Sequence, residues 1–542
     1  MFFAKMKSSQ QCEKLTNNCL IVVLQIIIVI LIAVNLTSTK KTQINGIIPH
    51  PYSISYLEAD RDFILSSSTV ICSNPDKPEL NIQAQLLSDY IRKQTLIQVV
   101  YSNASPDKCS IILDTGYYDA SEDAYKLTIN SNKIYINGTT EKGTFYGIQS
   151  LRKLISVQNE SNTVRLLPQE IIDRPRFSYR GLLLDVSRHF RTVEEVMRYM
   201  DMMALHNMNY LHLHLTDDQG WRIEIPQYPD LTRIGSVRKQ TLDDDQPHSG
   251  YYSRNEILDL IKYGQQRCIT IIPEIDIPGH MVSALASYPN LGCTGGPYFV
   301  AEHFGVFSDI LCYGNPDTMV FIKNVLNYVM DLFPSKYIHI GGDEAEKSQW
   351  EKCPKCQKKI EELGLVDDNF TTKEDKLQRH LTIELGKIIR AKGKTMIGWS
   401  EISHGEIIED SIVMSWLRSK NGEMPEKNYT VILSPMKPMY LDYSQDKYKG
   451  VNTLPRVYNY EPINENHTDS DYSRMLGIES CMWGEYTPSF SNVMLKVLPR
   501  IAAVSVAQWS FPQTKNYTRF LDDLEGLKKI YEVNEYMYHD TY

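Results

Sequence analysis

The sequence lacks a surplus of basic residues, an internal repeat and any low-complexity tract. Its 57 lysine and arginine residues are outnumbered by 66 aspartate and glutamate residues, which gives a net charge of -9. Binding to a nucleic acid requires a basic surface that neutralises phosphates, so we expect no nucleic-acid partner. No unit recurs at a period of roughly 20 to 50 residues, and a repeat architecture is therefore not expected.

Long apolar runs are missing after residue 34. Before that point, three lysines precede the run CLIVVLQIIIVILIAV at 19–34, and a basic stretch followed by an apolar core is typical of a signal peptide. The run holds about 15 apolar residues, fewer than the roughly 20 that a membrane helix needs. We expect residues 1–44 to be a leader, either cleaved as a signal peptide or retained as a membrane anchor.

N-x-S/T sequons are frequent enough to predict a glycoprotein. Each sequon alone is weak evidence, because the pattern often arises by chance. Together with the leader, the eight sequons predict entry into the secretory route and a lysosomal or secreted location. Their asparagines are Asn35, Asn103, Asn137, Asn159, Asn369, Asn428, Asn466 and Asn516.

Cysteines are few, and their use fits an oxidising compartment. Of the ten cysteines, Cys72 and Cys109 are the only two in the N-terminal part after the leader, so we expect them to form a disulfide. Cys268 and Cys481 fall in apolar runs that are typical of strands. We expect both to be buried free thiols.

Four further cysteines lie in or near predicted loops: Cys293, Cys312, Cys353 and Cys356. They allow three disulfide connectivities, between which the sequence does not choose. The CPKC segment at 353–356 also has the spacing of half a zinc site, but no second half with ligand spacing accompanies it. We therefore expect no metal and no other cofactor.

Short β-rich runs alternate with helical runs between residues 48 and 165, which predicts a small α+β domain over 45–172. Two prolines in LLPQEIIDRPRF at 166–177 then predict a linker. The strand-like runs are CSIILDTG (109–116) and AYKLTINSNKIYING (124–138), and the helix-like runs are PELNIQAQLLSDYIRKQ (78–94) and TFYGIQSLRKLISVQ (144–158).

After residue 175 the chain follows a rhythm in which a short apolar strand ends in polar residues and a helical segment follows. Eight such strands predict a (β/α)8 TIM barrel over 173–542, with its active site at the carboxyl ends of the strands. The expected strands are 180–187, 210–218, 268–276, 337–344, 394–401, 411–418, 430–442 and 477–485.

The ends of these strands carry carboxylates and aromatic rings. Indole and phenol faces stack on the apolar faces of sugars, while carboxylates bind hydroxyls. A single tryptophan or aspartate at such a place is as often a core residue or a loop cap, but the recurrence on strand after strand indicates a sugar site. The residues are Asp217, Asp218, Glu274, Asp276, His280, Asp343, Glu344, Trp399, Glu401, Trp416, Tyr440, Asp442, Trp483 and Glu485.

Seven motifs occur in order along the same region: RGLLLDVSRHF (180–190), HLHLTDDQGWRIEI (212–225), PEIDIPGH (273–280), HIGGDE (339–344), MIGWSE (396–401), MYLD (439–442) and MWGE (482–485). Together they resemble glycoside hydrolase family 20, the β-N-acetylhexosaminidases, of the lysosomal or secreted eukaryotic type. The upstream segment is similar to the small α+β domain that these enzymes carry.

This resemblance implies an exo-acting hydrolase that removes terminal GlcNAc or GalNAc from glycoconjugates or chitooligosaccharides. Glu344 would act as the general acid and then the base, while Asp343 would orient the 2-acetamido group of the substrate. The acetamido oxygen, held by Tyr440, would form an oxazolinium intermediate with net retention. Because adjacent carboxylates push their pKa values apart, we expect Glu344 to be protonated, Asp343 to be ionised and activity to peak at acidic pH.

The resemblance also implies contacts with the terminal sugar and a homodimer. Arg180 precedes the apolar run of its strand, so strand geometry alone places it at the opposite end of the barrel. The aromatic walls would be Trp399, Trp416 and Trp483, the hydroxyl ligands Arg180, Asp442 and Glu485, and the residues supporting the acid Asp217 and His280.

Three other functions share this pattern. The barrel could be a catalytically inactive carbohydrate-recognition protein, which the presence of Asp343, Glu344 and Tyr440 disfavours. It could be the scaffold of a membrane-tethered adhesion protein, which would require the leader to be retained. A retaining glycosidase with its own carboxylate nucleophile is the third, and such an enzyme would not need the acetamido group of the substrate.

Overall fold

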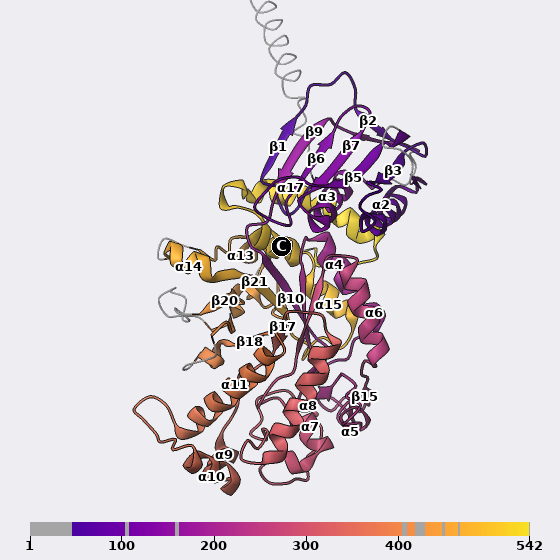
Figure 1. Ribbon diagram of the computed structural model, residues 1–542. Coiled ribbons are helices and arrows are strands. Elements are labelled where there is room, and N and C mark those ends of the chain that lie inside the picture. The colour runs from indigo at the N-terminus through magenta and orange to yellow at the C-terminus, as the bar shows by residue number, and fades with distance from the viewer. Residues whose placement is uncertain are drawn as a thin grey trace, which may run out of the picture. The chain divides into compact units, whose positions relative to one another are not determined.

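The computed structural model (Figure 1) describes residues 46–102, 108–157, 162–403, 409–417, 429–446, 450–463 and 467–540. The predicted leader lies outside these residues, as do five of the sequon asparagines. Of the other three, Asn369 and Asn516 are exposed and Asn137 is half-buried.

The N-terminal part, predicted as a small α+β domain, contains a seven-stranded mixed sheet. The helices α2 (Leu80–Thr95), α3 (Glu141–Leu154) and the C-terminal α17 (Tyr517–Val533) lie together on one face of it (Figure 1). The predicted disulfide joins Cys72 to Cys109, with Cα atoms 5.9 Å apart. The strands, in spatial order, are β1 (Ser53–Tyr56), β9 (Gln169–Asp173), β6 (Tyr125–Ile129), β7 (Ile134–Gly138), β5 (Ile111–Thr115), β3 (Val70–Ser73) and β4 (Val100–Tyr101).

The predicted linker at 166–177 proves to contain a strand. Within it, β9 pairs antiparallel with both β1 and β6, and its residues alternate between buried and half-buried. Pro168 and Pro175 flank this strand rather than interrupt it, which is where a sheet tolerates proline. The two prolines therefore mark the ends of a strand within the sheet.

Eight parallel strands close into a barrel, and all eight occur where the sequence predicts them. Almost all of their residues are buried, as expected for strands covered on both faces. The chain thus has the TIM-barrel architecture. The strands are β10 (Tyr179–Asp185), β11 (Tyr210–His214), β16 (Thr270–Glu274), β17 (Tyr337–His339), β18 (Thr395–Trp399), β19 (Ile412–Ser415), β20 (Thr430–Leu433) and β21 (Met475–Met482).

Helices connect these strands, and several begin at a capping box, in which a threonine or serine and an acid three residues later satisfy the free backbone N–H groups. The described helices are α4 (Val193–Leu205), α5 (Asp230–Arg233), α6 (Arg254–Gln265), α7 (Val282–Ser287), η2 (Pro289–Leu291), α8 (Pro316–Leu332), α9 (Ser348–Lys352), α10 (Pro354–Glu362), α11 (Lys373–Ala391), η3 (Ser400–Ser403), α12 (Met436–Met439), α13 (Leu454–Tyr458), α14 (Asp469–Arg474), α15 (Phe490–Val497), α16 (Arg500–Trp509) and η4 (Pro512–Thr514).

Three short antiparallel pairs also occur among the described residues. They are β12 (Thr216–Asp217) with β13 (Gly220–Trp221), β14 (Val237–Arg238) with β15 (His248–Ser249), and β2 (Phe63–Leu65) with β8 (Val164–Leu166). In the described part of the chain, no single helix has the length and apolarity of a membrane span, whereas the bent pair α15 and α16 passes that test on length and composition.

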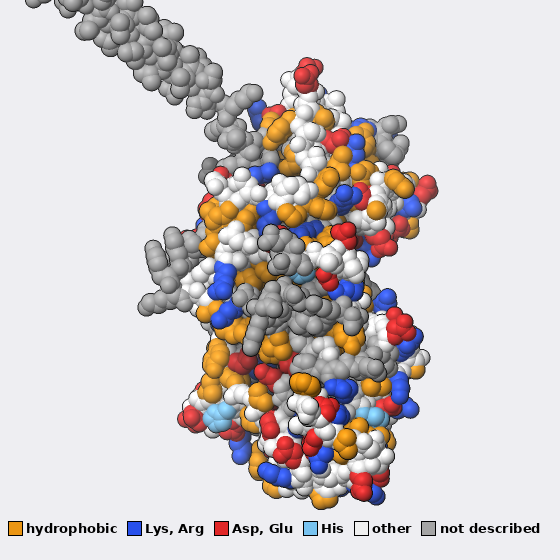
Figure 2. Space-filling model, turned by 90° about the vertical axis from the view of Figure 1, so that its left-hand side faces the viewer, with side chains coloured by type: hydrophobic (Ala, Val, Ile, Leu, Met, Phe, Trp, Pro, Cys, Tyr) orange, Lys and Arg blue, Asp and Glu red, His pale blue; other side chains and the backbone are white. Residues whose placement is uncertain are grey.

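Two cysteines outside the predicted loops were expected to be buried free thiols. Cys481 is a buried free thiol in β21, as predicted, whereas Cys268 is a half-buried free thiol just before β16. On the face that Figure 2 shows, acidic, basic and hydrophobic side chains of the described residues are interspersed.

Candidate active site

A pocket opens at the carboxyl ends of the barrel strands. It brings together most of the predicted site residues, although they come from segments far apart in the chain. Arg180 and three of the predicted strand-end acids, Asp218, Glu274 and Glu401, do not line it. Four further residues, which we did not predict, complete its wall: Arg188, His214, Met436 and Tyr443. The predicted residues that line it are Asp217, Asp276, His280, Asp343, Glu344, Trp399, Trp416, Tyr440, Asp442, Trp483 and Glu485.

The backbone after β17 turns sharply to aim the two adjacent carboxylates. Gly341 and Gly342 adopt φ values of 63° and 96°, which L side chains rarely take. A Cβ atom on Gly341 would lie 1.8 Å from Oδ1 of Asp276, while the N–H of Gly342 donates to that same oxygen at 3.0 Å. Glu344 itself has φ of 45°, a strained conformation of the kind that clusters at functional sites.

Asp343 is the enclosed member of the pair. Its side chain is 15% exposed, and its Oδ1 atom has no hydrogen-bond partner among the described residues. Burial raises the pKa of Asp343 to about 6, because the carboxylate loses hydration that the charge of His280, 3.8 Å from Oδ2, only partly replaces. The free oxygen is available to accept a hydrogen bond from a ligand.

Glu344 is the open member. Its side chain is 42% exposed, and its Oε2 atom lies 3.6 Å from Nε2 of His280. The interaction with His280 lowers the pKa of Glu344. The order of the two pKa values is therefore the reverse of our prediction, because burial and the histidine outweigh the mutual repulsion of the pair in the open pocket.

His280 connects Glu344 to a network of buried charges. Its Nδ1 atom lies 3.1 Å from Oδ1 of Asp217. Burial opposes the charged imidazolium, but the charge of Asp217 overcomes it and raises the pKa of His280 well above the usual value. Asp217 also contacts Arg188 at 2.8 Å and Nε2 of His214 at 2.8 Å. His280 is thus held as a cation beside Glu344.

Aromatic rings line the same pocket. The ring centroids of Trp399 and Trp483 are 5.7 Å apart, and those of Tyr440 and Trp483 are 6.1 Å apart. Trp416 and Tyr440 are nearly parallel, with an interplanar angle of 19°. The indole N–H of Trp399 donates to Glu274 at 2.9 Å. These flat, fixed faces can enclose an acetamido methyl group and a sugar ring.

A polar edge completes the pocket at Arg188, Asp442 and Glu485. Burial raises the pKa of Asp442 to about 7, and its Oδ1 atom has no partner in the described part of the chain. Arg188 lies 2.9 Å from Asp185 and 3.9 Å from Glu485. Such a set of charged donors and acceptors can bind sugar hydroxyls.

Arg180 does not belong to this pocket, and its assignment as a hydroxyl ligand was wrong. It stands near the start of β10, at the amino end of the barrel, and its side chain is fully buried. The guanidinium donates to Asp123 and to the hydroxyl of Tyr146, both at 2.9 Å. Arg188 lies in the same motif, just beyond the carboxyl end of β10, and strand direction alone singles it out as the arginine at the site.

Two groups of possible metal ligands adjoin the pocket: Asp217 with Asp218 and His280, and Asp276 with His280 and Asp343. His280 belongs to both groups, and its Nδ1 atom is directed at Asp217. Arg188 already lies 2.8 Å from Asp217, so its positive charge would repel a cation bound there. We assign no metal to either group.

A barrel whose strand ends carry carboxylates and indoles around one pocket has the architecture of the TIM-barrel enzymes. Residues 177–512 match the model of the catalytic domain of glycosyl hydrolase family 20, and residues 45–173 match domain 2 of the same family. The chain belongs to glycosyl hydrolase family 20.

Individual relatives agree with this assignment. A β-hexosaminidase of Porphyromonas gingivalis is 34% identical over 512 residues, which cover 91% of this chain and 64% of that protein. The β-hexosaminidase subunit beta of Homo sapiens is 29% identical over 421 residues, 75% of this chain and 69% of that protein. Since the bacterial protein is the more similar of the two, these relatives do not single out the eukaryotic type.

Among solved structures, an exo-β-N-acetylglucosaminidase from Vibrio harveyi in complex with N-acetylglucosamine is similar to this chain. Its TM-score is 0.82 at 30% identity, and the match covers 92% of this chain and 79% of that one. The fold of the chain, N-terminal sheet and barrel together, is thus that of a known enzyme structure.

Proposed function

We propose that the protein is an exo-acting β-N-acetylhexosaminidase that removes terminal, non-reducing GlcNAc or GalNAc with retention of configuration. The observation that carries the proposal is the pairing of Asp343 and Glu344 in one pocket that Tyr440 and tryptophans also line. One carboxylate is enclosed with a free oxygen, and the other is open beside a cation. This asymmetry suits two different roles for two like groups.

In the first step Glu344 donates its proton to the departing glycosidic oxygen. The acetamido oxygen of the substrate attacks the anomeric carbon as the bond to the leaving group breaks, and an oxazolinium ion forms. Asp343 accepts a hydrogen bond from the acetamido N–H through its free oxygen and stabilises the positive charge there. The hydroxyl of Tyr440 donates to the acetamido oxygen and directs it at the carbon.

In the second step Glu344, now ionised, takes a proton from water as that water attacks the anomeric carbon. The ring of the intermediate opens, which restores the acetamido group and leaves the sugar with its original configuration. Glu344 must enter the cycle protonated. A bound sugar that displaces water from the pocket would raise the pKa of Glu344 by desolvation, in opposition to His280.

The aromatic walls and the polar edge support exo action. Trp399 and Trp483 offer faces to one sugar ring, while Arg188, Asp442 and Glu485 offer groups to its hydroxyls. Enclosing the hydroxyls of a terminal residue leaves no path for a chain that continues beyond it. Chitooligosaccharides and glycoconjugates with such ends are the proposed substrates.

The experiment is hydrolysis of p-nitrophenyl β-GlcNAc and β-GalNAc at acidic pH by the wild type, Glu344→Gln and Asp343→Asn. We expect each variant to lose at least about a hundredfold in kcat, as removal of general acid–base help does. Glu346→Gln is the matched control, because Glu346 lies in the same loop but does not line the pocket. A folded wild type that is inert on both sugars would favour the carbohydrate-recognition alternative.

A second substrate series separates the acetamido mechanism from one with an enzyme nucleophile. Fluorine atoms on the acetyl group withdraw electrons from the acetamido oxygen. The rate should therefore fall with each fluorine if that oxygen attacks the anomeric carbon. A rate that does not change along the series would assign the nucleophile to a carboxylate of the protein.

We also propose a lysosomal or secreted glycoprotein that forms a homodimer. The apolar run at 19–34, the exposed sequons at Asn369 and Asn516, and the disulfide support entry into the secretory route. N-terminal sequencing and mobility after deglycosylation of the protein made in a eukaryotic host test this, and retention of residues 19–34 would instead indicate the membrane-anchored form. Light scattering tests the dimer.

A further inference from the structure

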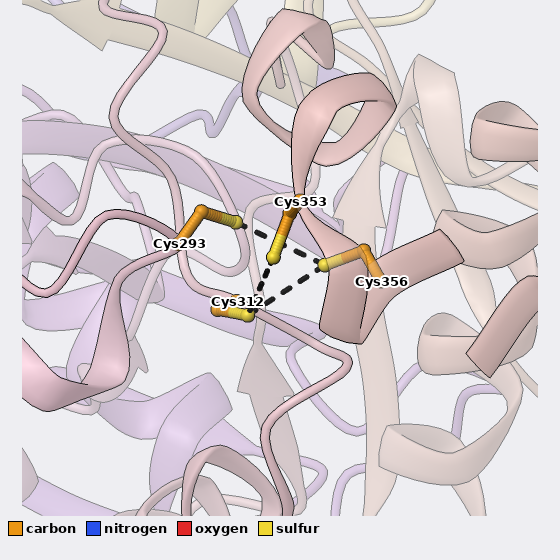
Figure 3. Close-up of side chains that lie close together, drawn as sticks. All are labelled: Cys293, Cys312, Cys353 and Cys356. Atoms are coloured by element: carbon orange, nitrogen blue, oxygen red, sulfur yellow. Dashed lines mark hydrogen bonds between the residues drawn. The ribbon is translucent and has the colours of Figure 1, made fainter. Parts of the chain in front are cut away.

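Four cysteines from two loops of the barrel meet in one cluster (Figure 3). Cys293 and Cys312 lie in the connection between β16 and α8, whereas Cys353 and Cys356 stand at the start of α10, after β17. The two halves are 41 residues apart at their nearest members. The sequence showed the CPKC half only, because the other half consists of two cysteines in one long loop.

The spacing of the sulfurs is that of a metal site. The distances are 3.8 Å for Cys293–Cys356, 3.6 Å for Cys312–Cys353 and 3.6 Å for Cys312–Cys356, and all four sulfurs lie within 4.8 Å of one another. Four sulfurs around Zn²⁺ at about 2.3 Å form a tetrahedron with edges of about 3.8 Å. The sulfur of Cys312 is equally close to two others, so the cluster does not divide into two bonded pairs.

The surroundings favour thiolates. Backbone N–H groups of Asn315 and Gly314 donate to the sulfurs of Cys312 and Cys356, respectively. Cys356 lies in the first turn of α10, where the helix dipole stabilises negative charge. Zinc is bound by thiolates, so these features lower the cost of forming the site.

The local packing and charge fit the same ligand. A Cβ atom on Gly314 would lie 2.2 Å from the backbone of Lys355, so the loop that carries Cys312 is in direct contact with the turn that carries Cys356. Cys312 and Cys356 are fully buried and Cys353 is 4% exposed. Four lysines between 352 and 359 provide positive charge near the net negative charge of a zinc ion with four thiolates.

We propose that Cys293, Cys312, Cys353 and Cys356 bind one Zn²⁺ in a closed, tetrahedral structural site. The four thiols release their protons to solvent as the ion binds, and no coordination position is left open for catalysis. Thiolate sets of this kind select zinc over hard cations such as Mg²⁺ and Ca²⁺. The site joins two loops that no strand pairing connects at this point.

The four-cysteine site lies close in sequence to the loop that carries the two catalytic carboxylates. The loop that carries Asp343 and Glu344 continues directly into α9 and then to Cys353. Between them, the indole N–H of Trp350 donates to the carbonyl of Leu311 at 2.9 Å, next to Cys312. The ion would therefore anchor the far end of the catalytic loop to the neighbouring loop and hold the pocket in shape.

The first experiment measures zinc in the purified full chain by mass spectrometry of the metal, after gel filtration without chelator. About one zinc per chain is expected for the closed site, and Cys312→Ser should lower the content by at least about tenfold, since even outer-shell changes weaken metal affinity by about 10- to 100-fold. Cys268→Ser is the matched control, because Cys268 is a free thiol outside the cluster. It should keep the full amount.

A second measurement keeps the test valid if Cys312→Ser does not fold. Exchange of zinc for Co²⁺ in the wild type should produce the visible bands of tetrahedral cobalt and the near-ultraviolet bands of cobalt bound to thiolate. Removal of the metal should also lower the Tm of the wild type. Absence of zinc together with absence of the cobalt bands, or peptide mapping that finds two disulfides among the four cysteines, would overturn the proposal.

Discussion

The Nε2 atom of His280 lies 3.6 Å from Oε2 of Glu344, and the charge of this ring is maintained by Asp217 on its other side. The general acid proposed here thus has a fixed cation as its neighbour in the open pocket. A cation stabilises the ionised carboxylate and so lowers the pKa of Glu344. The histidine thereby sets the pH at which the free enzyme loses its acid.

Substitution of His280 tests this relationship. Without the cation the pKa of Glu344 rises, so the limb of the profile of kcat/KM against pH that reports this ionisation should move to higher pH in His280→Asn. The wild type should have an acidic optimum. His380→Asn is the control, because His380 lies on α11, contacts the hydroxyl of Tyr313 and does not line the pocket. A limb that stays in place while kcat alone falls would show that His280 does not act through the ionisation of Glu344.

The two arginines of the RGLLLDVSRHF motif should differ in what they affect. Arg188→Ala removes a charge from the pocket wall, and we expect kcat/KM to fall by about a hundredfold. It also leaves buried Asp185 and Asp217 without this partner, so its stability should fall as well. Arg180→Ala leaves Asp123 without its buried partner and should lower stability by about 3 to 5 kcal/mol. Urea unfolding and steady-state kinetics on both variants measure this. Equal loss of kcat/KM in folded Arg180→Ala would return that residue to the site.

The sequence predicted the barrel well because its signal is local. Each strand is a short apolar run, and because the strands are parallel, the residues that follow them lie at the same end of the barrel. Asp217, Asp343 and Trp483 could therefore be assigned to a common site before any distance between them was known. Arg180 shows the limit of that reasoning when a motif is used in place of strand direction. It stands in the same motif as Arg188, but seven residues of β10 separate the two ends of the barrel.

Features that depend on contacts between distant segments were not predictable. The order of the pKa values of Asp343 and Glu344 depends on which carboxyl is enclosed and which one faces His280. Their adjacency in the sequence shows neither. The four-cysteine cluster forms because the loops after β16 and β17 meet. Likewise, the prolines that flank β9 predict a linker, whereas the pairing of β9 with β1 and β6 is not visible in the sequence.

Gly341 and Gly364 allow a matched test of the turn that positions the acids. Their φ values are 63° and 62°, so alanine costs similar backbone strain at both, of the order of 1 to 3 kcal/mol. A Cβ on Gly341 would collide with Asp276, whereas nothing lies within 4 Å of one on Gly364. We expect Gly341→Ala to abolish hydrolysis and Gly364→Ala to retain it. Similar activity in the two variants would show that the turn tolerates a side chain.

The raised pKa of Asp343 predicts that the active site destabilises the folded protein at neutral pH. The folded pKa is about 6 and the ordinary value is 3.8. Because the folded pKa is the higher one, the group's contribution to stability is fully present below the unfolded pKa and is lost as the pH rises through about 6. An amide at this position has no proton to lose.

Asp343→Asn should therefore be inactive yet more stable than the wild type at pH 7, by up to about 2 to 3 kcal/mol for a shift of this size. The gain should shrink as the pH falls and disappear below about pH 4, where Asp343 is protonated in both states. Thermal unfolding of both proteins at pH 7 and pH 4 measures the difference, and Glu346→Gln, in the same loop outside the pocket, should show no such dependence. A stability gain that is equal at both pH values would mean that the amide makes a better contact and that ionising Asp343 costs the folded protein nothing. A gain confined to neutral pH would show that the folded protein holds this carboxylate at an energetic cost.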